Sequence, residues 1–303
     1  MSLHRQLLYH SPGVSICDVC CRPEFRERGP EEHADKHLVV FPRSGVFLKQ
    51  VAGKEFVVDP NHVAFFNEGE SYRCAHPVGS GDDCTAFEFR PEALQEVIGV
   101  FSPTATERPH RLFEFTHVLS NQRVFVFQQR LRRQLLSGVA DALMIEESSL
   151  DLLAAVVRNA YLDRGIRPMR RRAATRQAHR EQSEKTRLFL ADRFSENLSL
   201  GDIARAVHSS TFHLARIFHR ETGMTMHQYR NDLRLRAALE RLVEGQADLT
   251  ALALDLGFSS HSHFSDAFRR AFGIPPSECR RSASLKWLRE MSKILKASGH
   301  AWT

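Results

Sequence analysis

The chain has 303 residues, of which 42% are hydrophobic, with 16 Gly and 12 Pro. This length and composition predict about two globular domains and exclude a disordered chain. No apolar run approaches the roughly 18 residues of a membrane span, and the first residues lack a signal-peptide pattern. We therefore expect a cytoplasmic protein with no membrane partner, whose six cysteines are reduced thiols.

The formal net charge of +6 is divided unevenly along the chain. Residues 1–163 carry 17 Lys and Arg against 22 Asp and Glu, a net charge of −5. Residues 164–303 carry 25 against 14, a net charge of +11. This division predicts that only the second half binds a polyanion, although a solvated basic surface gives the same count.

From residue 14 to about residue 88, short β-branched and aromatic runs alternate with turn signals such as "RSG", "AGK" and "DPN". Turn signals at this close spacing favour a sandwich or barrel over a parallel sheet. Between residues 123 and 162 the apolar spacing becomes helical and predicts two amphipathic helices. Their apolar faces either pack on their own sheet or form the interface of a homodimer, and the sequence leaves both open.

Residues 164–182 contain seven arginines and almost no apolar residues, so we expect a linker there. Residues 183–283 are helical and contain an imperfect repeat. "IARAVHSSTFHLARIFHRETG" (203–223) recurs as "LALDLGFSSHSHFSDAFRRAFG" (252–273), and each copy indicates helix, tight turn and helix. The long helix expected over 226–245 can place the two second helices in successive major grooves.

The second helix of each copy has an apolar side and a polar side. In the first copy the outward stripe is expected to be Phe212, Arg216 and His219, which suits a thymine methyl and a guanine edge. In the second copy Ser and His, which are poor helix formers but hydrogen-bonding groups, occupy that side. Ser210 and Ser260 are also suited to be N-caps, and the sequence does not separate this role from DNA contact.

This double unit resembles the AraC/XylS transcriptional regulators across residues 183–283. The resemblance rests on "FHLARIFHRETGMTMHQYRNDLRLRAALERL", the turn "GFSS" and the ending "FGIPP". It implies two helix-turn-helix units that bind DNA. We expect Arg216 to be the leading base reader, and Arg220, Arg269 and the linker arginines to attract phosphates. The expected DNA-binding residues are Ser210, Thr211, Phe212, Ala215, Arg216, His219, Arg220, Ser260, His261, Ser262, Ser265, Asp266 and Arg269.

Two positions depart from the family pattern, which often has arginine in place of Asp266 and tyrosine in place of Cys279. Asp266 either accepts a hydrogen bond from a cytosine amino group or pairs with Arg269 or Arg270. In the second case the second unit reads sequence weakly. Repulsion between the Asp266 carboxylate and DNA phosphates favours this second case.

The strand-rich segment loosely resembles the cupin-like sensor domain common in this family, which implies a pocket for an unknown small-molecule effector and a helical extension for dimerisation. No His-x-His pair is present, and His33 and His37 are four residues apart, so we expect no enzyme, no metal and no cofactor. Arg73 either grips an anionic effector or pairs with Glu68 or Glu70. The candidate pocket residues are His37, His62, Tyr72, Arg73 and His76.

Five cysteines lie in the same segment: Cys17, Cys20, Cys21, Cys74 and Cys84. On a strand, Cys17 and Cys20 would point to opposite faces. The favoured interpretation is that all five are small buried apolar residues. The alternative is that Cys84 meets Cys20 or Cys21 inside the barrel and, with His37 or His76, completes a zinc or thiol-redox site.

We therefore predict an α+β multidomain chain: a cupin-like β-barrel or sandwich (1–122), a helical extension (123–163), the linker (164–182), an all-α double helix-turn-helix domain (183–283) and a basic tail helix (284–303). The tail packs on the DNA-binding domain or lies on a membrane surface. The expected function is a homodimeric regulator of promoter DNA, with RNA polymerase as a partner if it activates. A thiol- or zinc-dependent redox-sensing regulator is the alternative, and a cupin enzyme fused to a DNA-binding domain is a remote one.

Overall fold

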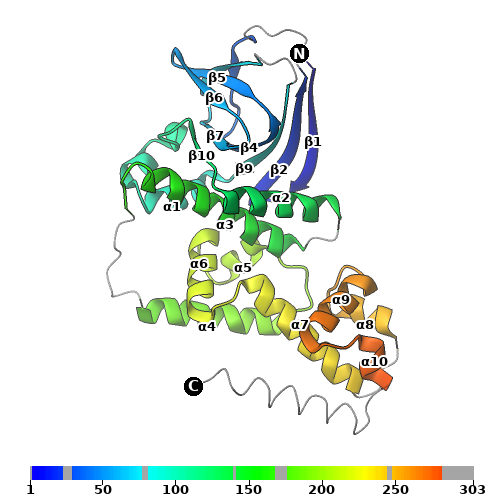
Figure 1. Cartoon of the computed structure of the whole chain (residues 1–303). Helices are drawn as coiled ribbons and strands as arrows, with labels where there is room; N and C mark the ends of the chain where they lie inside the picture. The colour runs from blue at the N-terminus through cyan, green and yellow to red at the C-terminus, as the bar shows by residue number, and fades with distance from the viewer. Residues whose placement is uncertain are drawn as a thin grey trace.

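The structure is a computed structural model that describes residues 2–22, 29–76, 81–138, 141–167, 176–243 and 248–281. A strand-rich N-terminal half precedes a helical C-terminal half (Figure 1), which confirms the expected fold class. We call residues 2–162 the barrel half and residues 176–281 the helical half. Within the described residues, no helix is long and apolar enough to span a membrane. The expected tail helix and residues 168–175 of the expected linker lie outside the described ranges.

Two antiparallel sheets build the upper part of the barrel half. The six-stranded sheet has the order β1 (Ser2–His10), β2 (Val14–Arg22), β9 (Asp82–Phe89), β4 (Leu38–Gly45), β7 (His62–Phe66) and β10 (His117–Leu119). The four-stranded sheet has the order β3 (Glu32–His33), β8 (Ser71–Ala75), β5 (Phe47–Val51) and β6 (Lys54–Val58). The sequence did not predict β1, because this edge strand is largely exposed and shows no clear alternation.

The central strands of the larger sheet are covered on both faces. On β2, Ile16 packs toward the helices, whereas Cys17 lines the space between the two sheets. Strands covered on both sides need apolar residues at consecutive positions. The continuous runs "VVF" in β4 and "AFF" in β7 follow from this double burial.

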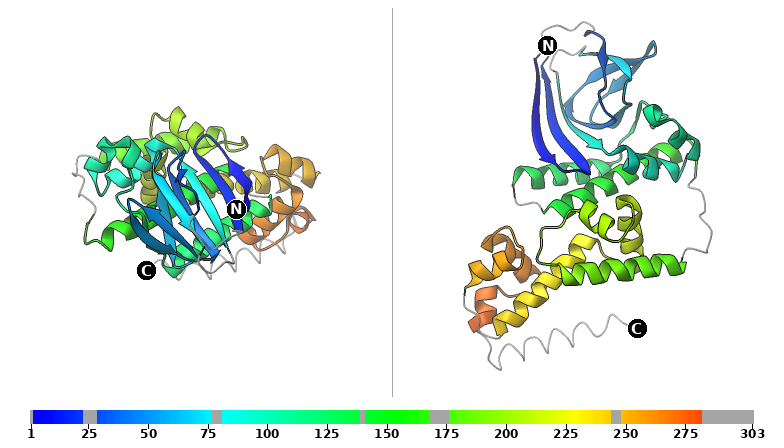
Figure 2. Two further views of the ribbon diagram at one scale, coloured as in Figure 1. Left: turned by 90° about the horizontal axis from the view of Figure 1, so that it is seen from above. Right: turned by 180° about the vertical axis from the view of Figure 1, so that it is seen from behind.

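A layer of helices separates the sheets from the helical half (Figures 1 and 2). It comprises α1 (Pro91–Gly99), the short 3₁₀ turns η1 (Pro103–Glu107) and η2 (Pro109–Arg111), α2 (Gln122–Leu136) and α3 (Ala142–Leu162). α3 is buried along most of its length, so it packs inside the molecule. α2 instead exposes the apolar side chains of Val126, Phe127 and Leu136.

The helical half consists of α4 (Arg176–Asp192), α5 (Leu200–Ala206), α6 (Thr211–Thr222), α7 (Met226–Val243), α8 (Leu249–Asp255), α9 (His261–Phe272) and α10 (Pro276–Arg281). The prediction of a linker up to residue 182 was wrong for residues 176–182, which belong to α4. The inward face of α4 carries His179, Ser183 and Thr186, all buried, in addition to Leu190. Polar side chains on a buried face hide the apolar period on which the sequence prediction depends.

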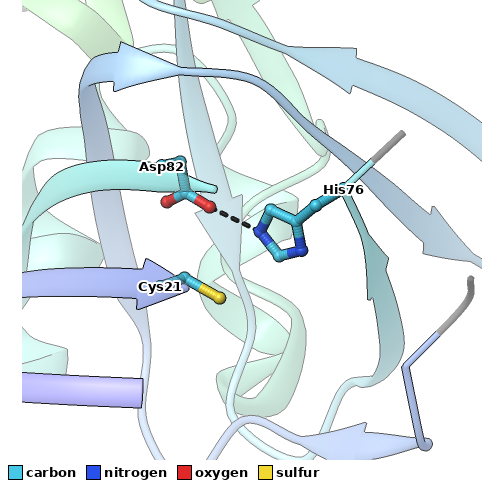
Figure 3. Close-up of side chains that lie close together, drawn as sticks. All are labelled: Cys21, His76 and Asp82. Atoms are coloured by element: carbon cyan, nitrogen blue, oxygen red, sulfur yellow. Dashed lines mark hydrogen bonds and ion pairs between the residues drawn. The ribbon is translucent and has the colours of Figure 1, made fainter. Parts of the chain in front are cut away.

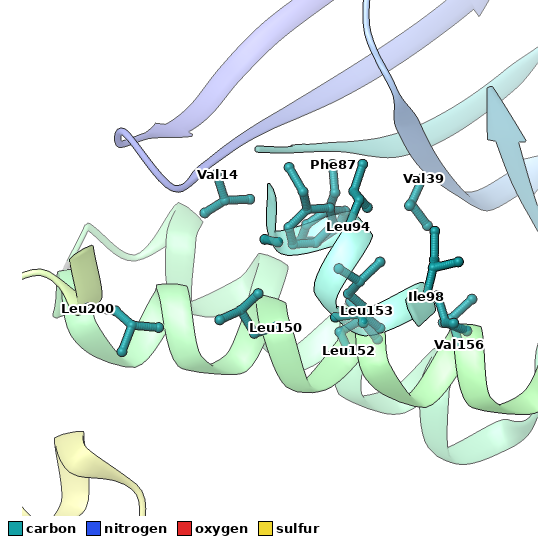
Figure 4. Close-up of a cluster of buried hydrophobic side chains, with 14 of the residues drawn as sticks. Val14, Val39, Phe87, Leu94, Ile98, Leu150, Leu152, Leu153, Val156 and Leu200 are labelled. Carbon is teal, nitrogen blue, oxygen red and sulfur yellow. The ribbon is translucent and has the colours of Figure 1, made fainter. Parts of the chain in front are cut away.

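One hydrophobic core joins the barrel half to the first part of the helical half. It extends from Val14 and Phe87 in the sheet, through Leu150 and Leu153 of α3, to Leu200 of α5 (Figure 4). The second helix-turn-helix unit has its own core around Phe264 and Phe268, so only the first unit shares a core with the barrel half.

Candidate nucleic-acid interface and barrel cavity

Two helix-turn-helix units lie on either side of α7. The first is α5 and α6, and the second is α8 and α9. Their turns contain residues with left-handed backbone at equivalent positions of the repeat, His208 (φ 54) and Gly257 (φ 81). A Cβ on Gly257 would lie 2.2 Å from the Ser195 carbonyl oxygen and 2.6 Å from Arg234 Nη2. The second unit therefore packs closely on α7 and on the loop that follows α4.

The polar residues of α9 lie on the surface. His261, Ser262, Asp266 and Arg269 are exposed, and Ser265 is half-buried. Ser260 caps α9, since its Oγ accepts from the His263 backbone N–H at 3.1 Å. The guanidinium of Arg270 donates to the backbone carbonyl of Asp266 at 3.2 Å and not to its carboxylate.

The first turn of α6 lies against α1 of the barrel half. Arg216, His219 and Arg220 are exposed, and Arg220 pairs with Glu221 at 2.8 Å. Phe212 and Ala215 are half-buried and pack against the shared core. The expectation that Phe212 faces outward was therefore wrong for this arrangement, because α1 covers that end of the helix.

A cleft of about 510 Å³ runs between α1 and the start of α6. Glu92 and Glu96 of α1 line it together with Ser210 and Thr211, and Arg90 and Arg205 also contribute to its lining. Ser210 occupies the N-cap position of α6, but its side chain makes no capping hydrogen bond. Residues expected to face DNA thus lie opposite two acidic side chains of the barrel half.

Three carboxylates at the start of α3 reach into the helical half, and we call Asp141, Glu146 and Glu147 the acidic latch. Glu146 Oε2 accepts from the Leu200 backbone N–H, at the first residue of α5, at 2.6 Å. The two oxygens of Glu147 accept from the backbone N–H groups of the first two residues of α7 at 2.8 and 2.9 Å. Unpaired N–H groups and the positive end of the helix dipole favour a carboxylate at such positions.

Asp141 binds the arginines of α7. Its Oδ1 accepts from the fully buried Arg230 at 2.5 Å, and its Oδ2 lies 3.7 Å from Arg234 Nη1. The same Oδ1 caps α3 by accepting from the Leu143 backbone N–H at 3.0 Å. Burial raises the pKa of Glu147 from 4.5 to about 7 despite its two backbone hydrogen bonds. None of the three latch residues was expected from the sequence.

A cavity of about 190 Å³ lies between the two sheets of the barrel half. Among the expected effector residues, Tyr72 and His76 line it. The other three lie elsewhere, which corrects the expectation of one shared pocket. His37 Nε2 donates to the Pro109 carbonyl at 2.9 Å, His62 pairs with Asp59 at 2.8 Å, and Arg73 pairs with Glu31 at 3.1 Å. Arg73 thus pairs with neither Glu68 nor Glu70, because β8 places it beside the segment that contains β3.

Four of the five candidate cysteines line this cavity: Cys17, Cys21, Cys74 and Cys84. Cys20 does not line it, and its thiol hydrogen-bonds Asp83. All six cysteines of the chain are free thiols. Burial raises the pKa of Cys21 to about 11 and that of Cys74 to about 12.

Cys21, His76 and Asp82 form a buried cluster at one end of the cavity (Figure 3). Their ligand-type atoms all lie within 4.8 Å of one another. His76 Nε2 hydrogen-bonds Asp82 Oδ1 at 2.6 Å, and the Cys84 thiol donates to Asp82 Oδ2 at 3.0 Å. The alternative zinc set from the sequence was Cys84 with Cys20 or Cys21 and with His37 or His76. It did not include Asp82, which only strand register places opposite Cys21.

Comparison with known proteins identifies the helical half. A helix-turn-helix domain model matches residues 203–282. The chain is 27% identical over 284 residues to the HTH-type transcriptional activator RhaS of Enterobacter sp., covering 91% of this chain and 95% of that protein. It is 24% identical over 240 residues to the uncharacterized HTH-type transcriptional regulator YbfI of Bacillus subtilis, covering 78% of this chain and 82% of that protein.

Among solved structures, ToxT from Vibrio cholerae is 9% identical and aligns over 88% of this chain and 98% of its own, with a TM-score of 0.32. An AraC-type transcriptional regulator from Chromobacterium violaceum is 29% identical, aligns over 36% of this chain and 97% of its own, and has a TM-score of 0.34. The matched helix-turn-helix residues and the full-length similarity to transcription regulators agree with the double repeat seen in the structure. These findings support an AraC-type DNA-binding transcription regulator.

Proposed function

We propose that this protein reads its promoter with α6 and α9, and that the barrel half controls whether α6 is free to do so. The observation that carries the proposal is the unequal exposure of the two helices. α9 presents its polar side to the surface, whereas the first turn of α6 lies against α1.

Base reading is assigned to the exposed polar residues of both helices. Arg216 is proposed to contact a guanine edge, the commonest specific contact of arginine in a major groove. His261 and Ser262 at the start of α9 are proposed to contact base edges in the second groove. Arg220 and Arg269 are exposed near the ends of their helices and supply attraction to phosphates that does not depend on sequence.

The arrangement described here is proposed to be a closed state. A recognition helix must enter a groove about 12 Å wide, and α6 cannot do so while α1 contacts its first turn. Glu92 and Glu96 also place negative side chains where DNA phosphates would approach. The acidic latch holds α5 and α7 in this position. An open state in which the first unit leaves α1 is therefore proposed to be the one that binds DNA.

A signal that binds the barrel half more tightly in one state shifts the balance between closed and open molecules. The cavity between the sheets is the proposed place for that signal. The exposed apolar residues of α2 support a homodimer through that helix. Because several relatives are named transcriptional activators, activation through RNA polymerase is proposed as well.

Thiol oxidation is the second candidate signal, favoured by four cysteines around one cavity. It is the weaker candidate, because a buried thiol of raised pKa forms little of the reactive thiolate at neutral pH. The relatives are named as transcription regulators, and no catalytic activity is part of the proposal.

Selection of DNA from a random duplex pool by the full-length protein tests the function. We expect enrichment of a site with two short conserved segments about one helical turn apart, one for each recognition helix. Footprinting on the enriched site should show protection of both segments. A pool without enrichment, at low salt and with correctly folded protein, would contradict sequence-specific reading.

A further inference from the structure

The cluster of Cys21, His76 and Asp82 brings together both sheets of the barrel half. Cys21 on β2 and Asp82 on β9 are directly opposite each other in the larger sheet. His76 follows β8 of the smaller sheet and reaches across the cavity (Figure 3). The backbone at this point is tightly packed, since a Cβ on Gly45 would lie 2.1 Å from the Gly81 carbonyl oxygen. The end of β9 that carries Asp82 is therefore held firmly in place.

The carboxylate of Asp82 is buried without a permanent cation. Its partners are the imidazole of His76 and the thiol of Cys84. Among the residues that the structure describes, no Lys or Arg side chain forms an ion pair with it. Burying a carboxylate that no fixed positive charge neutralises is unfavourable, and a bound cation offsets that cost.

The three donor atoms indicate which cation fits. A thiolate, an imidazole and a carboxylate are ligands of zinc and similar divalent metals, whereas magnesium and calcium prefer oxygen alone. Tetrahedral zinc, with bonds of about 2.0–2.3 Å, needs ligand atoms roughly 3.3–3.8 Å apart. Side-chain adjustments of about 1 Å bring the present atoms, within 4.8 Å of one another, to that spacing.

We propose that Cys21, His76 and Asp82 bind one zinc-class divalent ion inside the barrel half, and that this ion is the signal for the regulator. The second clause rests on the proposed function. Binding converts the Cys21 thiol to a thiolate and releases its proton to solvent, while His76 binds as neutral imidazole. Cys84 is a positioning residue, because its thiol orients the second oxygen of Asp82.

Three protein ligands leave a fourth tetrahedral position for water or a small ligand from the adjoining cavity. The ion would join β2 and β9 of one sheet to the end of β8 in the other. Because β2 and β9 also contribute to the core shared with α3 and α5, a change in strand position at the site has a packed route to the helical half.

The experiment uses the full-length protein freed of metal with a chelator. Zinc affinity is measured by competition with a chromophoric chelator, cobalt substitution reports a thiolate-to-metal absorption band, and magnesium serves as the hard-cation control. Cys21→Ser removes a ligand, and Cys84→Ala removes only the thiol that orients Asp82. Cys17→Ser is the matched control, since it lies on the same strand, lines the same cavity and is not in the cluster. Circular dichroism establishes that each variant is folded.

We expect one zinc ion per chain in the wild type and in Cys17→Ser. Cys21→Ser should lose both zinc binding and the cobalt band. Cys84→Ala should keep the band and bind zinc with an affinity lowered about 10- to 100-fold. A wild-type protein that binds no zinc, or a folded Cys21→Ser that binds as tightly as the wild type, overturns the site.

DNA binding is then measured with and without zinc on the selected site. A zinc-dependent change in affinity that is absent in Cys21→Ser supports the ion as the signal. Zinc bound without any change in DNA affinity overturns that role. Failure to bind DNA under all conditions refutes the proposed function and leaves the metal site standing.

Discussion

The substitution Asp141→Asn tests the closed state by removing one charge from the acidic latch. Asparagine is as good an N-cap as aspartate, so the cap on α3 is preserved. The fully buried Arg230 then loses its only carboxylate among the described residues, and Arg234 loses a neighbouring negative charge. Removing one partner of a buried ion pair costs about 3–5 kcal/mol. Because the Asn oxygen still accepts a hydrogen bond, we take about 3 kcal/mol, or roughly 150-fold, as the shift toward the open state.

The expected result is tighter DNA binding by Asp141→Asn. If the wild type is about 99% closed, the apparent affinity rises by up to about 100-fold and then levels off at that of the open state. Fluorescence anisotropy with the selected duplex measures the affinity, and amide hydrogen exchange at residues 200, 226 and 227 reports release of the latch. Asp18→Asn is the matched control, because Asp18 is also buried and pairs with Arg132 inside the barrel half. Unchanged exchange and affinity in Asp141→Asn, or the same gain in Asp18→Asn, would refute the latch.

Three further predictions concern DNA affinity. The Arg216→Ala protein should no longer protect the selected site in footprinting but should still bind DNA nonspecifically. The control Arg236→Ala, on the exposed side of α7, should still protect the site. Asp266→Arg should tighten DNA binding and make the slope of log affinity against log salt steeper by about one phosphate contact. Weaker binding would instead indicate that Asp266 contacts a cytosine. Burial raises the pKa of Glu147 in the closed state, so that state binds the extra proton and loses stability as pH rises from about 5 to 7. DNA affinity should increase over that range more in the wild type than in Glu147→Gln, and parallel pH profiles would contradict this assignment.

The helix-turn-helix units could be predicted from sequence because local features specify them. Apolar spacing identified Leu214 and Phe218 as core residues, and both are fully buried. Gly257 marked the turn of the second unit, where a left-handed backbone and a close approach require glycine. The equivalent turn of the first unit uses His208 in the same conformation, a position that a search for glycine does not reveal.

The latch and the metal cluster could not be predicted in the same way, because long-range packing creates them. Glu146 and Glu147 are adjacent acidic residues on an amphipathic helix, a pattern typical of a solvent-exposed face. They are buried only because α5 and α7, more than 50 residues away, begin against α3. The cluster depends in turn on strand register. A slip of one residue would point Cys20, and not Cys21, toward Asp82.

The free energies of the closed and open states limit how a signal can open the molecule. Shifting a molecule from about 99% closed to 99% open requires roughly 5.5 kcal/mol of preferential binding to the open state. The Asp141–Arg230 pair alone accounts for about 3 kcal/mol of the closed state on the estimate above. The loss of this one contact is therefore more than half of the free energy that the signal must supply through preferential binding to the open state. The remaining roughly 2.5 kcal/mol corresponds to a preference of about 70-fold for the open state. Because Asp141 caps the start of α3 and binds Arg230 of α7, displacement of α3 is the route by which we propose that the barrel half controls DNA binding.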